Sequence, residues 1–177
     1  MAKSRIHVFG AFRTDRGAQY AAEQLAKQGI PRKAIGLLVS ERARQRLMTI
    51  ERHTKAPEGI AAGGVAGGVL GALLAGLSTV ATAVVPGVAL LAAGPLVSLL
   101  AGVGAGAAAG GTVGGIIGLG IEDHEAKLYD QVLKDDGVLV TVSTDDKRTR
   151  DLAEQIFEEC GAIRIETATG ATARITE

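Results

Sequence analysis

Two histidines are the residues of this chain whose surroundings most resemble a metal site. His124 lies within the run EDHE at residues 122–125, and His53 follows Glu51. Imidazole and carboxylate groups together are ligands for transition metals, so the two clusters would form a site if they met in space. The two histidines flank the two ends of the long apolar segment and could come together there, but two exposed, solvated residues at the membrane surface are the better interpretation. We therefore expect no metal and no cofactor.

Two other features suggest chemistry but are better explained by structure. Cys160 stands beside Gly161 at the end of a predicted helix, where the thiol pKa is raised rather than lowered, so we interpret it as a packing residue. The glycine-rich residues 102–106 (GVGAG) lack the preceding strand and the downstream acidic residue of a dinucleotide-binding loop. Since no nucleophile elbow is present either, the sequence predicts no catalytic residue and no enzyme.

Charge is divided unevenly along the chain. Residues 1–58 hold 12 Lys/Arg and 5 Asp/Glu, and residues 122–177 hold 7 and 14, although the whole chain is formally neutral. A nucleic-acid-binding protein usually carries a net basic surface, so we expect no nucleic-acid partner. The single cysteine excludes an intrachain disulfide and is typical of a reducing compartment.

The first flank has the pattern strand, helix, strand. Residues 5–12 alternate and are rich in strand formers, Thr14 and Asp15 are N-cap residues for a helix over residues 16–28, and residues 34–40 form the next strand.

The second flank repeats this pattern. Strands are predicted over residues 137–143 and 162–168. The run Thr144-Asp145-Asp146, with Thr144 as the cap residue itself, is expected to start a helix that runs to about Cys160. Residues 122–136 form an amphipathic helix ahead of the first of these strands.

Two βαβ halves of this size predict an α+β fold, a split ferredoxin-like domain of four antiparallel strands backed by two helices. Each half has too little apolar surface to be stable alone, so the halves should fold together. The expected division is a first half (1–41), a basic linker (42–58), an inserted glycine- and alanine-rich helical hairpin (59–121) and a connecting helix with the second half (122–177).

The inserted segment is 63 residues long and has no charged residue between Glu58 and Glu122. It far exceeds the ~20 apolar residues that cross a bilayer. We predict two helices, over about residues 60–85 and 96–120. The turn between them is marked by four residues: Pro86, Gly87, Gly94 and Pro95.

Glycines recur every four residues in both predicted helices, which places them along one helix face where backbones approach closely. These glycine ladders are Gly59, Gly63, Gly67 and Gly71 in the first helix and Gly102, Gly106, Gly110, Gly114 and Gly118 in the second. Folding the chain between Pro86 and Pro95 brings Gly67 opposite Gly114. The symmetry predicts that the two ladders pack against each other within one hairpin.

The expected partner of this hairpin is the lipid bilayer, together with further copies of the chain. The basic residues just before the segment favour a cytoplasmic (inner) membrane protein whose soluble domain faces the cytoplasm. The alternative is a cytoplasmic soluble oligomer that buries its hairpins in protein, because the apolar turn PGVALLAAGP is unusual for a loop in water.

Three stretches carry a resemblance to a known family: VFGAFRTDRGAQYAAEQLAKQGIPRKAIGLLVSE, IEDHEAKLYDQVLKDDGVLVTVSTDD and AEQIFEECGA. Through them the chain resembles the bacterial general stress protein (YflT-like) and low-complexity glycine-zipper membrane protein family. The resemblance implies a split ferredoxin-like domain with a glycine-rich hairpin inserted. It brings no catalytic residues.

These observations predict a non-enzymatic, membrane-embedded, self-associating protein that is plausibly stress-related. Two alternatives stay open. One is a sensor module that binds a ligand or partner and is anchored by the hairpin, with the small-molecule ligand unknown. The other is a soluble cage or ring.

Overall fold

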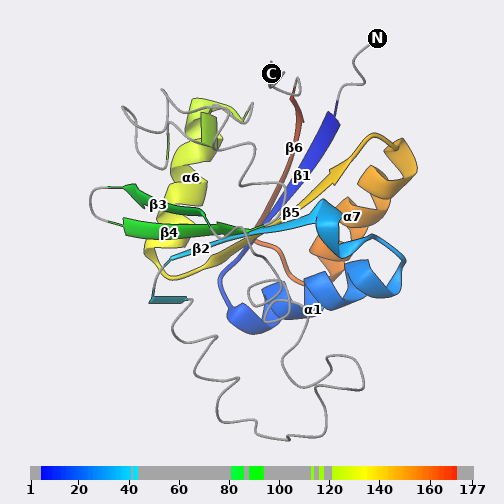
Figure 1. Cartoon of the computed structure of the whole chain (residues 1–177), viewed down its shortest axis with the longest axis horizontal. Coiled ribbons are helices and arrows are strands. Elements are labelled where there is room, and N and C mark those ends of the chain that lie inside the picture. Colours follow the sequence, from blue (N-terminus) through cyan, green and yellow to red (C-terminus); the bar gives the residue numbers. More distant parts are fainter. Residues whose placement is uncertain are drawn as a thin grey trace, which may run out of the picture.

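The computed structural model describes residues 5–40, 42–43, 81–85, 88–93, 113, 116–117 and 121–170. The elements along the chain are β1 (Arg5–Phe12), α1 (Asp15–Lys27), the short 3₁₀ helix η1 (Arg32–Ala34), β2 (Ile35–Ser40), β3 (Ala81–Val85), β4 (Val88–Ala93), α6 (Asp123–Lys134), β5 (Val138–Thr144), α7 (Lys147–Glu159) and β6 (Arg164–Gly170) (Figure 1).

The strands of the two flanks form one antiparallel sheet in the order β2-β5-β1-β6. Val8 of β1 lies opposite Val142 of β5 on one side and Thr167 of β6 on the other, and Leu37 of β2 lies opposite Val140 of β5. A strand of the second half therefore lies between the two strands of the first half. The predicted α+β class is confirmed, and the antiparallel sheet with its helices is compatible with a ferredoxin-like fold.

The first helix begins and ends where the sequence predicts. Thr14 has extended backbone geometry and its hydroxyl accepts a hydrogen bond from the Gly17 N–H at 3.2 Å, as an N-cap residue does. Gly29 follows the helix with a φ of +84°, a left-handed conformation that favours glycine. The apolar side of the helix is buried in the core, namely Ala18, Ala21 and Ala22 together with Leu25.

The N-cap of α7 differs from the prediction. Thr144 is the last residue of β5, and the cap is Asp146, whose side chain accepts from the Thr149 N–H at 3.0 Å. Thr144 instead accepts from the Asp146 N–H at 3.0 Å and fixes the turn that leads to the cap. Gly161, with a φ of +78°, follows the end of α7 as predicted.

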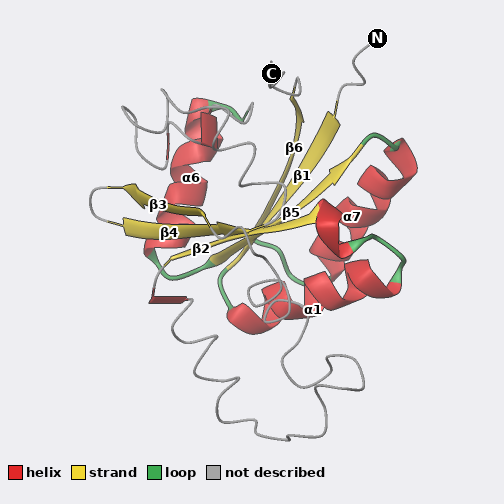
Figure 2. Cartoon of the chain, in the orientation of Figure 1, coloured by secondary structure: helices red, strands yellow, loops and turns green. Residues whose placement is uncertain are grey.

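The sheet is covered on both faces (Figure 2). On one face, α1 and α7 pack against Val8, Phe12 and their neighbours. On the other, α6 contributes Tyr129 and Leu133 to a second apolar cluster with Phe9 of β1. The amphipathic helix predicted over residues 122–136 is therefore confirmed, and its apolar side covers the face that α1 and α7 leave open.

The inserted segment does not have the predicted secondary structure at its centre. Residues 81–85, predicted as the end of a helix, form β3, and residues 88–93, predicted as the turn, form β4. The two strands pair with each other, and β4 extends the sheet by pairing with β2, with Leu91 opposite Val39. The sheet thus has six strands, in the order β3-β4-β2-β5-β1-β6.

A physical reason for this difference lies in the residues themselves. Thr82, Val84 and Val85 are β-branched, lose side-chain freedom in a helix and favour strands. The outer edge of β2 also carries backbone groups that need hydrogen-bond partners. An uncharged run that pairs with this edge satisfies its own backbone as well, whereas an apolar loop would leave it in water.

Parts of the hairpin prediction lie outside the described residues. These parts are all nine ladder glycines and the four turn residues Pro86, Gly87, Gly94 and Pro95. Within the expected second helix, Val113, Ile116 and Ile117 are helical, and Ile116 is buried against the α6 face of the sheet. Among the residues that the structure describes, no helix combines the length and the apolar character needed to cross a membrane.

The packing of Gly10 gives a test of the α7 face. A Cβ atom at this position would lie 2.7 Å from Cδ2 of Phe157, a fully buried ring that also meets Phe12 edge to face. We predict that Gly10→Ala destabilises the protein by about 1–3 kcal/mol, measured by urea unfolding. A double variant with Phe157→Leu should cost less than the sum of the two single variants. If the two destabilisations simply add, contact with the Phe157 ring is not the reason that alanine is unfavourable at position 10.

Candidate interaction surface

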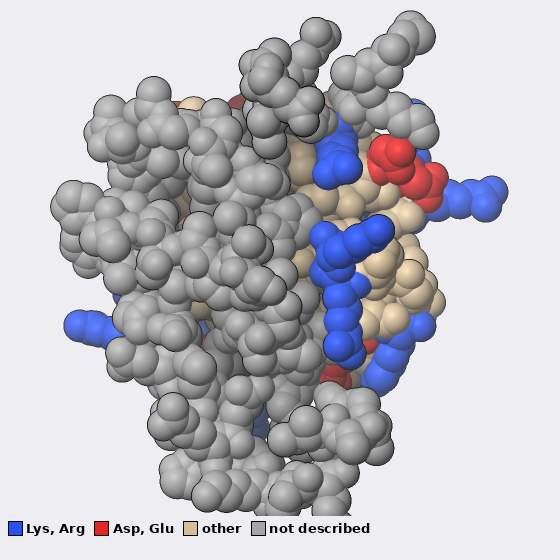
Figure 3. All heavy atoms as spheres, viewed as in Figure 1, with Lys and Arg blue, Asp and Glu red and all other residues tan. Residues whose placement is uncertain are grey.

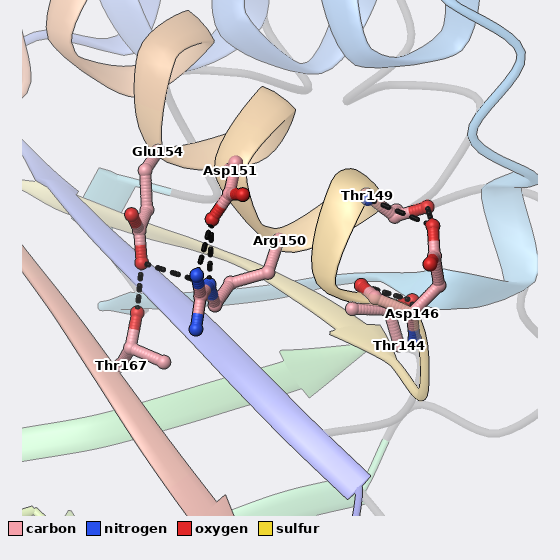
Figure 4. A network of polar contacts seen from close by, with 7 residues as sticks. All are labelled: Thr144, Asp146, Thr149, Arg150, Asp151, Glu154 and Thr167. Atoms are coloured by element: carbon pink, nitrogen blue, oxygen red, sulfur yellow. Dashed lines mark hydrogen bonds and ion pairs between the residues drawn. The ribbon is translucent and has the colours of Figure 1, made fainter.

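Several charged and polar side chains lie where α7 is next to β6. Asp146 starts the helix, and hydrogen bonds from the backbone and side chain of Thr149 hold the pKa of its carboxyl below the usual value. One turn further on, Arg150 donates from Nε to Asp151 at 2.8 Å and lies 3.9 Å from a carboxylate oxygen of Glu154 (Figure 4). The start of the helix is therefore locally balanced in charge.

Glu154 also ties the helix to the last strand. The Thr167 hydroxyl of β6 donates to a Glu154 carboxylate oxygen at 2.6 Å, and Figure 4 shows the two side chains pointing toward each other. This contact joins α7 to the strand at one point, and the space beside it is open.

That space is a wide, open groove of about 720 Å³. Its walls come from α7 and from β6, and its lining residues are Asp151, Glu154, Gln155, Glu158, Ile165, Glu166 and Thr167. Three carboxylates of the lining come from α7, namely Asp151, Glu154 and Glu158. The side chain of Glu166 lies on the α6 face of the sheet, because Glu166 is opposite Phe9 in the register. Arg150 pairs with Asp151 and Glu154, and Glu158 makes no ion pair with any described residue. The groove, called the acidic groove below, therefore has more carboxylates than cations among the described residues.

The acidic groove was not among the predicted sites, but the sequence carries a signal for it. Asp151, Glu154 and Glu158 are spaced three and four residues apart, which puts them on one face of a helix. On the face seen in Figure 3, by contrast, Lys and Arg cover more of the described surface than Asp and Glu.

The other face of the sheet holds polar groups under α6. Arg164 of β6 pairs with Glu125 of α6 at 3.2 Å. Among the residues that the structure describes, the buried hydroxyls of Tyr129 and Thr141 find no hydrogen-bond partner. Burial raises the pKa of Tyr129 far above its ordinary value of 10, and the carboxylates of Glu166 and Glu125 raise it further.

Beside Tyr129 and Thr141 lies a cavity of about 10 Å³, otherwise lined by apolar residues. This is at most the space of one water molecule. The α6 face is therefore a packed interior with no room for a small-molecule ligand at this point.

His7 is the one histidine that the described fold buries. Its Nδ1 lies 2.8 Å from the Ser143 hydroxyl of β5, and only 3% of the residue is exposed. Burial lowers the pKa of His7 below 6.5, and the nearby charge of Arg5 lowers it further. A neutral imidazole that is hydrogen-bonded to a serine hydroxyl can act as a general base. Among the described residues, however, no carboxylate is hydrogen-bonded to the other ring nitrogen of His7.

The predicted metal cluster falls partly outside the described chain. His124 is exposed in the first turn of α6, while His53 and Glu51 lie outside the described residues. Across the described ranges, no group of three or more His, Cys, Asp or Glu residues is placed to hold a metal ion. Whether the two histidines meet stays an open prediction.

Packing explains Cys160 and Tyr129, which carry a reactive and a polar group, but it does not explain Tyr20. Cys160 is half-buried against the α7 core, and burial followed by the charge of Glu159 raises the pKa of its thiol, as expected for a packing residue. Tyr129 is buried as a packing residue should be, whereas Tyr20 is 54% exposed on α1.

Comparisons with known proteins add no relative. No protein-family model matches the chain, and no match is found among curated proteins or solved structures. The function of the chain is therefore inferred from the geometry described above.

The burial of His7 predicts how stability changes with pH. Its folded pKa is below the unfolded value of about 6.5, so the unfolded chain binds more protons as pH falls below that value, and stability is lost there. In His7→Gln this loss is absent. We expect the free energy of unfolding of the wild type to fall relative to the variant between about pH 7.5 and 5.5, measured by urea titration. A difference that is constant with pH would show that His7 does not titrate abnormally.

Proposed function

We propose that this is a non-enzymatic, self-associating protein, in which the α+β domain carries the long uncharged segment and other copies of the chain cover that segment. The observation that carries the proposal is the pairing of β4 with β2. It ties the centre of the uncharged segment to the same sheet as both flanks.

This pairing constrains where the rest of the segment goes. Residues 59–80 run from the basic linker to β3, and residues 94–120 run from β4 to the start of α6. A bilayer crossing takes ~20 residues and puts its two ends on opposite sides. Both ends of residues 94–120 lie on one folded unit, and 27 residues are too few for two full crossings. Cover by protein fits this constraint better than a spanning hairpin.

Composition supports the need for cover of some kind. Glycine destabilises water-exposed helices by ~1 kcal/mol each relative to alanine, and the segment holds most of the 25 glycines of the chain. The glycine ladders offer close packing between helices without bulky side chains. Self-association would bury these faces with the same contacts repeated in every copy.

A second candidate is the membrane-embedded, plausibly stress-related protein that the family resemblance implies. It is favoured by one sequence observation, the complete absence of charge between Glu58 and Glu122. In this form the segment enters the bilayer without spanning it, and the basic residues of the linker contact anionic headgroups.

Cell fractionation followed by size measurement separates the candidates. We predict that the protein is recovered without detergent as an oligomer of several chains. Recovery only from the membrane fraction would favour the second candidate, and a monomer in plain buffer would contradict both. Gly67→Leu/Gly114→Leu should lower stability and weaken assembly, because leucine blocks the close approach of the two ladders within each hairpin. The matched control Tyr20→Leu changes an exposed residue of α1 and should leave the size unchanged.

A further inference from the structure

The two edges of the four-stranded sheet are treated differently. The edge at β2 is covered by β4 and β3 from the same chain, whereas β6 is the last strand of the sheet on its side. Within the described residues, nothing pairs with the outer edge of β6. An edge strand presents unpaired N–H and C=O groups and is a template for an added strand.

Natural proteins usually protect such an edge, and β6 lacks the common protections. Its seven residues, Arg164–Gly170, include no proline and no lysine. Its one cation, Arg164, pairs with Glu125 beneath α6. Ile165, Thr167 and Thr169 favour an extended strand. Both charged residues of the strand, Arg164 and Glu166, lie on the α6 face of the sheet, so no charge of β6 itself lies on the α7 side of this edge.

The acidic groove lies directly beside this edge. Ile165, half-buried, gives the groove an apolar floor, and Ile163, just before β6, is 44% exposed. The carboxylates of Asp151, Glu154 and Glu158 of α7 line the groove beside that floor. An added strand would place alternate side chains over the groove, so its best fit has apolar and cationic side chains.

We propose that the edge of β6 and the acidic groove bind an extended, lysine- or arginine-bearing segment of another protein as an added strand. Backbone hydrogen bonds to β6 supply the pairing, and the carboxylates select the charge of the partner. A second copy of β6 is a poor occupant, because two acidic grooves would face each other and like charges repel. The proposal does not depend on self-association through the uncharged segment.

The test uses the full-length protein and a dye-labelled peptide, Lys-Val-Lys-Val-Lys-Val-Lys, which matches the seven residues of β6. Binding is followed by fluorescence anisotropy at low salt. We expect saturable binding, and about tenfold weaker binding to Glu154→Gln/Glu158→Gln. The control Glu122→Gln/Asp135→Asn removes two exposed acids of the α6 region and should bind like the wild type.

A second peptide separates strand addition from simple charge attraction. Methylation of alternate backbone nitrogens keeps the charge but removes the hydrogen-bond donors that pair with a sheet edge, so binding should fall about tenfold. Equal binding of the methylated peptide, equal binding of a Glu-Val peptide, or no binding at all would overturn the proposal. Displacement of the lysine peptide by unlabelled protein would assign the edge to a second copy and would also overturn it.

Discussion

The constraint on which the whole structure depends is the placement of β5 between β1 and β2. Val142 and Val140 of β5 lie opposite residues of the first half, Val8 and Leu37, so neither half of the chain completes a sheet alone. The pairing also brings the ends of the 63-residue insertion back to one folded unit. The insertion must therefore start and end at the same sheet.

The insertion meets this constraint by contributing to the sheet itself. β4 covers the edge of β2 and extends the sheet, while α6 covers the face that α1 and α7 leave open. Among the described residues, the outer edge of β6 has no paired strand, and carboxylates of α7 lie beside it. Within the described residues, the sheet thus has one edge paired by the chain itself and one edge without a paired strand, and the proposed binding of a second protein uses that second edge.

Local signals in the sequence predicted much of the fold. Thr14 and Gly29 mark the ends of α1 because a cap and a left-handed turn depend on neighbouring residues alone. The cap of α7 was misplaced by two residues, since Thr144 and Asp146 are both capable caps and only the length of β5 decides between them.

β3 and β4 were missed because glycine and alanine periodicity dominates the pattern of the segment. Their β-branched residues were visible, but the edge of β2 that pairs with them is a tertiary feature. The acidic groove needed two elements to meet, and only its helical half shows as a spacing in the sequence.

The pairing of β4 with β2 can be tested directly with one disulfide. Ser40 and Leu90 are opposite each other in the register, and opposed antiparallel residues lie about 4.5–5.5 Å apart at Cα, within the range of a disulfide. Because Cys160 is the one cysteine of the chain, Ser40→Cys/Leu90→Cys in a Cys160→Ser background gives an unambiguous pair. Mild oxidation should produce a crosslink within a single chain, identified by mass spectrometry of the proteolysed protein. Free thiols after oxidation, or crosslinks only between chains, would contradict the placement of the uncharged segment in the sheet.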